Sequence, residues 1–385
     1  MSDKDVTVIY GVLNERTEHE KRAALTPDIV SRLTKSGIQC LMESGAGLDA
    51  HFLDSDYEKA GARIASRDEI ITIADVLAFI SRPTSEVVSS LRAGTWIVGA
   101  MNSFTDEGYI NILKTSGVTA VAMERLPRQL SSAQSMDEMT SQNSITGYKA
   151  VLKAADAYTS ILPMMTTAAG TIRPAKVLVL GAGIAGLQAI GTAKRFGAVV
   201  TGYDVRPAAQ SEVESLGAKF LDLNIDLGKD QGDGGYAREL SDEEKVLQQA
   251  AVDQKASEFD IIITTAQVPG RKPPVLLTAK GIACLKRGAV VVDCAASEFG
   301  GNVEGSKPRE VIRTDNGVTI LGLPDLASDV STTASQQISR NLADTVLHFM
   351  REKDGQIKLT VDFDDEIDKA MIVAYSQENV NENKE

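Results

Sequence analysis

Short runs of apolar residues alternate with amphipathic segments through the first third of the chain. Thr26 and Pro27 form the pattern of a helix start, and Gly37 follows the expected end of that helix at Lys35. Such alternation predicts a parallel sheet covered by helices on both faces. The expected strands are Val6–Tyr10, Ile38–Met42, Ala62–Ile64, Val76–Ile80, Thr95–Val98 and Thr119–Ala122, and the expected helices are Pro27–Lys35, Tyr57–Ala60, Arg67–Ala74, Thr84–Leu91 and Asp106–Lys114.

A second series of apolar runs follows, and it predicts six strands, the number in a full dinucleotide-binding fold. A long helix, Ser141–Tyr158, leads into this series, and another, Ser331–Met350, can carry the chain back to the first domain. The strand Ile357–Val361 and the helix Asp364–Tyr375 would complete that domain. The six strands are Val177–Leu180, Val199–Tyr203, Lys219–Leu221, Ile261–Thr264, Val290–Asp293 and Thr319–Leu321.

We therefore predict an α/β fold with two doubly wound parallel-sheet (Rossmann-like) domains, joined by long helices and separated by a cleft. Residues 1–140 with 330–385 form the first, flavodoxin-like domain, and residues 141–329 form the Rossmann domain. The first domain has no phosphate-binding glycine loop of its own. We interpret Gly45-Ala-Gly47 as a turn.

A glycine-rich turn directly follows the strand at Val177–Leu180. Gly181 would allow the tight turn, Gly183 would let the backbone approach a pyrophosphate, and Gly186 would let the next helix pack close to the strand. The N-terminus of that helix offers unpaired N–H groups to phosphate oxygens. Asp204 ends the following strand, where a carboxylate can accept hydrogen bonds from a ribose diol. Together these features predict a dinucleotide site.

The bulk composition narrows the class of protein. With 385 residues, 43% hydrophobic and 24% charged, the sequence indicates a globular protein of two or three domains. The net charge of −13 argues against nucleic-acid binding. The three cysteines and three histidines show no metal-ligand spacing, so we expect reduced thiols and no metal. No signal peptide or membrane-spanning segment is expected from the sequence.

Three further segments suggest functional loops. The polar stretch 123–143 lies between the two series of strands, where a cleft-lining segment belongs, although a solvated linker has the same composition. The long insertion Asp222–Tyr236 contains Gly234, Gly235 and Tyr236, which could form a mobile flap or a simple surface excursion. Exposed apolar residues in Leu162–Pro174 could form a dimer arm.

Taken together, these motifs resemble the NAD(H)-binding region of the alpha subunit of proton-translocating NAD(P) transhydrogenases. Alanine dehydrogenases share the architecture and the motif at Arg22–Pro27. The resemblance covers nearly the whole chain. Its motifs are Arg128, Ala133–Asp137, Ser141-Gln142, Gly147-Tyr148, Met164–Gly170, Ala182–Leu187, Ala193–Arg195, Gly197–Val200, Asp204–Arg206, Gly234–Ala237, Thr264–Ala266, Pro269-Gly270 and Gly300–Asn302.

The resemblance implies roles for individual residues. Arg128, Gln134 and Asp137 match the loop that reaches over the nicotinamide and contacts the partner domain, so they are the candidate catalytic residues. Gln134 would hold the nicotinamide ring or its carboxamide. This loop lacks the family's second arginine, and Asn14 replaces a common lysine. The implied NAD(H)-binding residues are Gly181, Gly183, Ile184, Ala185, Gly186, Asp204, Val205, Arg206, Arg128, Gln134, Asp137, Met139, Thr140, Gly234, Gly235, Tyr236, Thr265, Ala266 and Gln267.

The need for a proton donor separates two enzyme hypotheses. Reducing a carbonyl or imine requires an acid beside the substrate, whereas hydride transfer between two nicotinamides requires only close approach and exclusion of water. Alanine dehydrogenases are expected to carry a lysine where Phe79 stands and a histidine near Ala100. With both groups absent, the sequence favours transhydrogenation over an alanine dehydrogenase-like activity. A third hypothesis is a non-catalytic NAD-binding regulator.

The resemblance also implies the cofactors and partners. Asp204 would repel a 2′-phosphate, which favours NAD(H), although Arg206 could accommodate one. The second nicotinamide, that of NADP(H), would be bound by a partner beta subunit. The chain would be a homodimer that docks on this subunit and on a membrane-domain subunit, at the cytoplasmic face of the inner membrane, with hydride transfer coupled to proton translocation by the membrane subunits.

Overall fold

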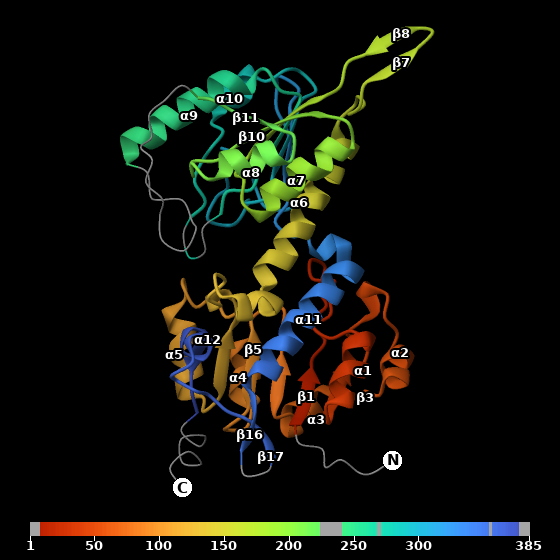
Figure 1. The fold of residues 1–385 in the computed structure, drawn as a ribbon, viewed down its shortest axis with the longest axis vertical. Coiled ribbons are helices and arrows are strands. Elements are labelled where there is room, and N and C mark those ends of the chain that lie inside the picture. Colours follow the sequence, from red (N-terminus) through yellow and green to blue (C-terminus); the bar gives the residue numbers. More distant parts are fainter. Residues whose placement is uncertain (1–7, 224–240, 268–269, 271, 354–355, 377–385) are drawn as a thin grey trace. The chain divides into compact units, whose positions relative to one another are not determined.

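The computed structural model describes residues 8–223, 241–267, 270, 272–353 and 356–376. The chain divides into two compact units (Figure 1). Unit 1 comprises Met1–Gln142 and Ser328–Glu385, and unit 2 comprises Asn143–Ala327. Each unit is a sheet covered by helices, so the predicted fold class of two Rossmann-like α/β units is confirmed.

The sheet of unit 1 has seven strands in the order β18-β6-β5-β4-β1-β2-β3. All neighbours are parallel except β18, which runs antiparallel to β6. Six parallel strands in this order form the pattern 3-2-1-4-5-6 of a dinucleotide-binding fold, which differs from the flavodoxin-like order that we expected. The strands are β1 (Val8–Val12), β2 (Ile38–Glu43), β3 (Arg63–Ala65), β4 (Val76–Ala78), β5 (Trp96–Gly99), β6 (Thr119–Ala122) and β18 (Ile372–Ala374).

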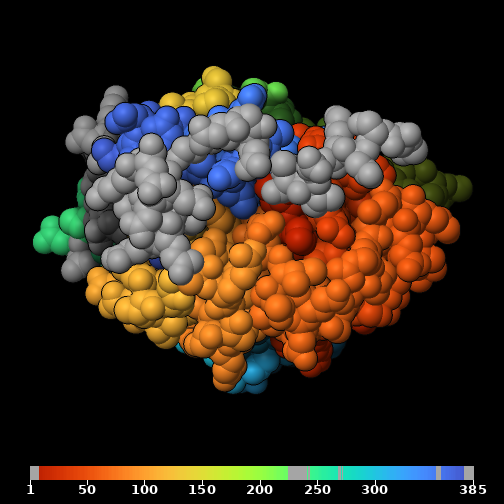
Figure 2. All heavy atoms as spheres, turned by 90° about the horizontal axis from the view of Figure 1, so that it is seen from below, coloured from red at the N-terminus to blue at the C-terminus, as the bar shows by residue number. Residues whose placement is uncertain are grey.

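Helices from both ends of the sequence cover this sheet. The helices α1, α2 and α11 contribute to the core on one face, and α3, α4 and α5 contribute to the core on the other. Figure 2 shows C-terminal segments (blue) beside N-terminal ones (red and orange) on the surface of unit 1. The helices are α1 (Pro27–Lys35), α2 (Asp54–Ala60), α3 (Arg67–Ile73), α4 (Ser85–Ser90), α5 (Glu107–Thr115), α11 (Ser331–Phe349) and α12 (Glu366–Met371), with short 3₁₀ turns η1 (Leu48–Ala50), η2 (Met123–Arg125), η3 (Ser131–Met136) and η5 (Ser328–Val330).

The C-terminal region of unit 1 differs from the prediction. The expected helix Asp364–Tyr375 is shorter, because α12 ends at Met371 and the chain continues as the edge strand β18. The end of the expected helix Ser331–Met350 instead begins a hairpin of β16 (Met350–Lys353) and β17 (Gln356–Leu359). Both differences arise because pairing with a neighbouring strand overrides the local helical pattern.

Among the described residues of unit 2, the sheet also has seven strands, in the order β11-β10-β9-β12-β13-β15-β14. The six predicted strands are present and parallel, with the arrangement 3-2-1-4-5-6. The seventh, β14, is an antiparallel edge strand that the sequence analysis missed. The strands are β9 (Lys176–Leu180), β10 (Val199–Tyr203), β11 (Lys219–Phe220), β12 (Ile261–Thr264), β13 (Val290–Asp293), β14 (Val311–Arg313) and β15 (Thr319–Gly322).

Small residues allow the helices of unit 2 to pack closely. A Cβ atom added at Gly147, in α6, would lie 2.0 Å from the backbone oxygen of Ala185, in α7. The predicted helix after the insertion is confirmed as α9, which begins with a capping box between Ser241 and Glu244. The helices are α6 (Glu138–Ala157), α7 (Ile184–Arg195), α8 (Ala209–Ser215), α9 (Asp242–Ala256) and α10 (Ala279–Cys284), of which α6 begins in unit 1.

A β-hairpin extends from the sheet of unit 2 (Figure 1). It consists of β7 (Met165–Thr167) and β8 (Gly170–Ile172), and all of its strand residues are exposed. Met164 is 66% exposed and Ile172 is 47% exposed. The hairpin coincides with the segment that we predicted as a dimer arm.

Candidate nucleotide site

The glycine turn of unit 2 connects β9 to α7. Gly181 has φ +96°, a conformation that favours glycine, and Gly183 is the N-cap of α7. A Cβ atom added at Gly186 would lie 1.8 Å from the backbone oxygen of Gly181, so only glycine allows this helix to pack so close to the strand. A Cβ atom at Gly183 would meet no atom within 4 Å, and this open space is what a pyrophosphate at the helix N-terminus would need.

Two further predicted segments lie beside this turn. At the end of β10, the Asp204 Oδ2 atom accepts a hydrogen bond of 2.8 Å from the backbone N–H of Ala182. After β12, the Thr265 hydroxyl donates to the Gly181 carbonyl at 3.0 Å. The structure therefore brings the glycine turn, Asp204–Arg206 and Thr265–Gln267 together at the carboxyl ends of three adjacent strands. Ile184 and Ala185 form the first turn of α7.

Asn302 holds the loop that follows β12, and we assigned it no role from the sequence. Its side chain accepts a hydrogen bond from the Ala266 N–H and donates to the carbonyls of Ala266 and Pro274. The buried Asp293 accepts in turn from the N–H of Asn302. The only sequence signal for this arrangement was the pair of glycines before Asn302.

In unit 1, three residues of the polar loop form a hydrogen-bonded cluster. The guanidinium of Arg128 donates to Asp137 at 2.9 Å and to the Thr140 hydroxyl at 3.0 Å. Asp137 also accepts from the backbone N–H and the hydroxyl of Thr140. Gln134 lies on η3 with an exposed side chain, and Met139 lies in the first turn of α6, partly buried. Gly234, Gly235 and Tyr236 lie outside the described residues.

Two glutamates of unit 1 were not singled out by the sequence analysis. Glu15 follows β1 and accepts hydrogen bonds of 2.9 Å from the backbone N–H groups of Ile80 and Ser81, after β4. Burial raises the pKa of Glu138, the first residue of α6, to about 7. The Glu138 Oε2 atom is buried and has no hydrogen-bond partner among the described residues. Apart from the position of Glu138 next to Asp137, the sequence carried no signal for either residue.

The partly buried carboxyl group of Glu15 leads to a pH prediction. Burial raises the pKa of this carboxyl group from 4.5 to about 8. The two N–H donors and nearby Arg22 lower the pKa, whereas nearby Glu20 raises it. The folded protein binds the Glu15 proton more tightly than the unfolded chain does. The contribution of this proton to the free energy of unfolding is therefore complete below about pH 4.5 and is lost as the pH rises to about 8. Relative to Glu15→Gln, which cannot titrate, the wild type should lose free energy of unfolding between about pH 5 and pH 8 in urea titrations. A difference independent of pH would contradict this.

The positions that would carry the acid of an alanine dehydrogenase are apolar. Phe79 follows β4 and is 3% exposed, and Ala100 follows β5. The guanidinium of Arg22, in the motif shared with alanine dehydrogenases, donates two hydrogen bonds to Glu20 and one to Gln142. This arginine is therefore already engaged by other side chains.

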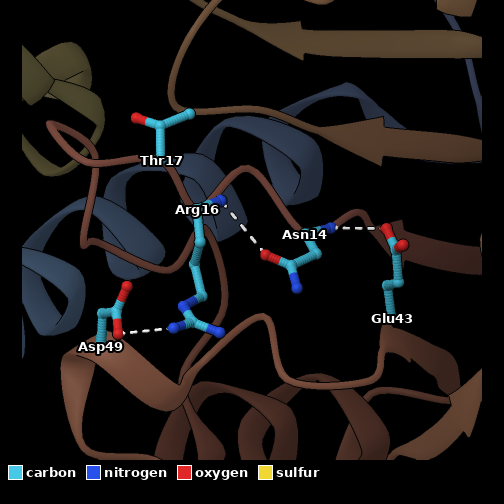
Figure 3. A pocket seen from close by; sticks show the side chains of 5 residues that line it. All are labelled: Asn14, Arg16, Thr17, Glu43 and Asp49. Carbon is cyan, nitrogen blue, oxygen red and sulfur yellow. Dashed lines mark hydrogen bonds and ion pairs between the residues drawn. The ribbon is translucent and has the colours of Figure 1, made fainter.

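A polar pocket of about 440 Å³ also lies in unit 1, at the loops after β1 and β2 (Figure 3). Two of its charged groups pair with each other, because Arg16 contacts Asp49 at 2.6 Å, and Glu43 accepts from the Asn14 N–H at 2.7 Å. Thr17 completes the lining. None of the described residues that are predicted to bind NAD(H) lines this pocket, so the candidate nucleotide site is the one at the glycine turn of unit 2.

The strand order and the glycine turn of unit 2 are those of a Rossmann-like, dinucleotide-binding fold. Residues 11–146 match the family model for the alanine dehydrogenase/PNT N-terminal domain, and residues 150–382 match the model for the C-terminal domain. The chain belongs to the alanine dehydrogenase/PNT family.

Within this family, the chain is similar to transhydrogenase subunits. It is 41% identical to an NAD(P) transhydrogenase subunit alpha chain of Rickettsia prowazekii over 96% of this chain and 95% of that protein. It is 40% identical to the corresponding chain of Rhodospirillum rubrum over 85% of this chain and 86% of that protein. Alanine dehydrogenase of Mycobacterium tuberculosis is 28% identical over 77% of this chain and 75% of that protein. The predicted resemblance is thus confirmed, and the homology supports assigning this chain as a component of an NAD(P) transhydrogenase.

Solved structures give the same result. The transhydrogenase from Sinorhizobium meliloti matches with a TM-score of 0.84 and 38% identity, covering 96% of this chain and 99% of that chain. An L-alanine dehydrogenase matches with a TM-score of 0.71 and 24% identity, over 88% of this chain and 89% of that chain, and shares the fold. None of the helices in the described portion of the chain has the length and apolarity needed to cross a bilayer.

Proposed function

We propose that this chain binds NAD(H) in unit 2 and passes hydride between that cofactor and NADP(H) held by a partner chain. The observation that carries the proposal is the glycine turn with Asp204 at the end of β10, in a chain 41% identical to a transhydrogenase alpha subunit. The nicotinamide, when bound, supplies or receives the hydride.

Unit 2 would bind and select the cofactor. The open space at Gly183 and the N-terminus of α7 would receive the pyrophosphate, and Asp204 would accept hydrogen bonds from the adenosine ribose. A carboxylate at this position repels a 2′-phosphate, which favours NAD(H) over NADP(H). Val205, Ala266 and Gln267 would line the same site.

Unit 1 would orient the reacting ring, a role that comes from the sequence resemblance. Gln134 would contact the nicotinamide through its amide. Arg128, Asp137 and Thr140 would hold the loop that carries Gln134, because their hydrogen bonds connect the loop to the start of α6. Met139 would lie beside them, and the sequence resemblance also assigns Gly234, Gly235 and Tyr236, which lie outside the described residues, to cofactor binding. Hydride transfer between two nicotinamides needs no proton donor. This agrees with the apolar, buried Phe79 at the position where an alanine dehydrogenase is expected to carry a lysine.

We further propose that the chain is a homodimer. The exposed apolar side chains of the β7–β8 hairpin, among them Met164, Met165 and Ile172, support an arm that packs against a second copy. A molar mass in solution equal to one 41.1 kDa chain would contradict the dimer.

In the complete assembly the dimer would dock on an NADP(H)-binding beta subunit and on a membrane-domain subunit. The membrane-domain subunit would couple hydride transfer to proton translocation, at the cytoplasmic face of the membrane.

Reconstitution tests the proposed function. The purified chain should bind NADH but oxidise it slowly, and addition of an NADP(H)-binding transhydrogenase subunit should start hydride transfer to NADP⁺ or an analogue, followed by absorbance. Rapid reduction of pyruvate in the presence of ammonia by the chain alone would favour the alanine dehydrogenase alternative. NADH binding without any transfer in the reconstituted system would favour an NAD-binding regulator.

A further inference from the structure

The carboxylate of Asp204 is fully occupied by hydrogen bonds in the structure. It accepts from two backbone N–H groups, those of Ala182 at 2.8 Å and Arg206 at 2.9 Å. It also accepts from the guanidinium of Arg206, at 3.1 Å from Nε and 3.3 Å from Nη2. A carboxylate offers about four acceptor positions, so these four donors saturate it. Its side chain is only 10% exposed.

This saturation conflicts with binding of a ribose. A ribose diol would donate two hydrogen bonds to Asp204, and both need acceptor positions that are already filled. The backbone donors are fixed by the turn after β10 and by the glycine turn. The side chain of Arg206 can rotate, and it supplies two donors, the same number that the diol would bring.

Arg206 also has an alternative partner outside the ribose position. Its Nη2 atom lies 4.0 Å from the Glu212 carboxylate, in α8, and the Glu212 side chain is 44% exposed. A small rotation of the guanidinium would therefore replace one carboxylate by another. While Arg206 remains on Asp204, its Nη2 donates to the Ala182 carbonyl at 3.0 Å. Ala182 is then held at its N–H by Asp204 and at its C=O by Arg206.

We propose that Arg206 is a latch on the ribose position, and that NAD(H) binds by displacing its guanidinium from Asp204 toward Glu212. The inference rests on the proposed function, because it takes NAD(H) as the ligand of unit 2. Arg206 is then a positioning residue that keeps Asp204 and the glycine turn in place before the cofactor arrives. It competes with the ribose for the same acceptors, so it lowers affinity for the cofactor.

Arg206→Met tests the latch, because methionine keeps an unbranched side chain without donors or charge. NADH should bind about three- to tenfold more tightly to this variant in calorimetric titrations, since the competing charge-assisted hydrogen bonds are gone. The preference for AMP over 2′-deoxy-AMP should rise about tenfold, because the 2′-hydroxyl no longer has to displace the guanidinium. Glu212→Gln should weaken NADH binding about two- to threefold, because the displaced guanidinium loses its charged partner.

The control variant is Arg195→Met, an exposed arginine at the end of α7, whose NADH affinity should stay within about twofold of the wild type. Arg206→Lys provides a second variant if the methionine variant folds poorly. Lysine keeps the charge but loses the two-point contact, so tighter NADH binding than in the wild type is again expected.

Weaker NADH binding by Arg206→Met or Arg206→Lys, or an unchanged preference for AMP over 2′-deoxy-AMP, would overturn the latch while leaving the proposed function intact. Absence of NADH binding by the wild type itself would instead overturn the proposed function.

Discussion

Replacing Gly186 by alanine should destabilise unit 2 by about 3 kcal/mol and prevent NADH binding. The added Cβ atom would lie 1.8 Å from the Gly181 oxygen, 2.8 Å from its carbonyl carbon and 3.1 Å from the Thr265 hydroxyl. Two of these three atoms belong to the backbone, which cannot move aside as the end of a flexible side chain can. To make room, α7 would have to move away from β9, and the N-terminus of α7 would leave its position beside Asp204.

A second glycine in α7 provides a matched control. A Cβ atom added at Gly191 would meet no atom within 4 Å, so Gly191→Ala should raise the free energy of unfolding by about 0.5–1 kcal/mol through helix propensity alone. Urea denaturation and NADH titration of the two variants would separate the effect of the close contact from that of a lost glycine. Wild-type NADH affinity in Gly186→Ala would show that the contact is not needed for binding.

Gln134→Asn should lower the rate of hydride transfer in the reconstituted system about 10- to 100-fold, with NADH affinity changed less than about threefold. The side chain of Gln134 is exposed on η3 and forms no hydrogen bond with the described residues, so the fold does not depend on it. Asparagine keeps the amide but is one methylene shorter. If the amide orients the nicotinamide, this shortening misplaces the ring, and a displacement of about 1 Å is enough for such a loss.

Gln336→Asn makes the same change at an exposed position of α11 and should leave the rate unchanged. Equal effects of the two substitutions on hydride transfer would contradict the role of Gln134. If the chain were an NAD-binding regulator, Gln134→Asn would show no catalytic deficit, because there would be no catalysis to lose.

The sequence predicted the parallel strands of both sheets because each is a short apolar run next to a turn or a helix pattern. It did not predict the antiparallel edge strands β14 and β18. Val311 is 61% exposed, and an edge strand with one free side needs no continuous apolar pattern. The residues of β18 follow a helical pattern closely, and only the neighbouring β6 shows that the chain becomes extended there.

Prediction of the candidate site had a similar limit. The glycine spacing and Asp204 were found because each belongs to a local motif in the sequence. The hydrogen bond from Arg206 to the Ala182 carbonyl, and the contacts of Asn302 with the loop after β12, depend on segments that meet only in the folded chain. Glu15 was missed for the same reason, since its two N–H donors come 65 and 66 residues later.

Unit 1 is assembled from two separate segments of the sequence, with unit 2 inserted between them. During synthesis on the ribosome, unit 2 is therefore complete before unit 1 can finish folding. Until α11 emerges, one face of the unit 1 sheet lacks the helix that contributes Ile338, Leu342 and Phe349 to its core, each fully buried in the finished protein. A nascent chain stalled near residue 327 would expose this apolar face, which makes it a target for chaperones.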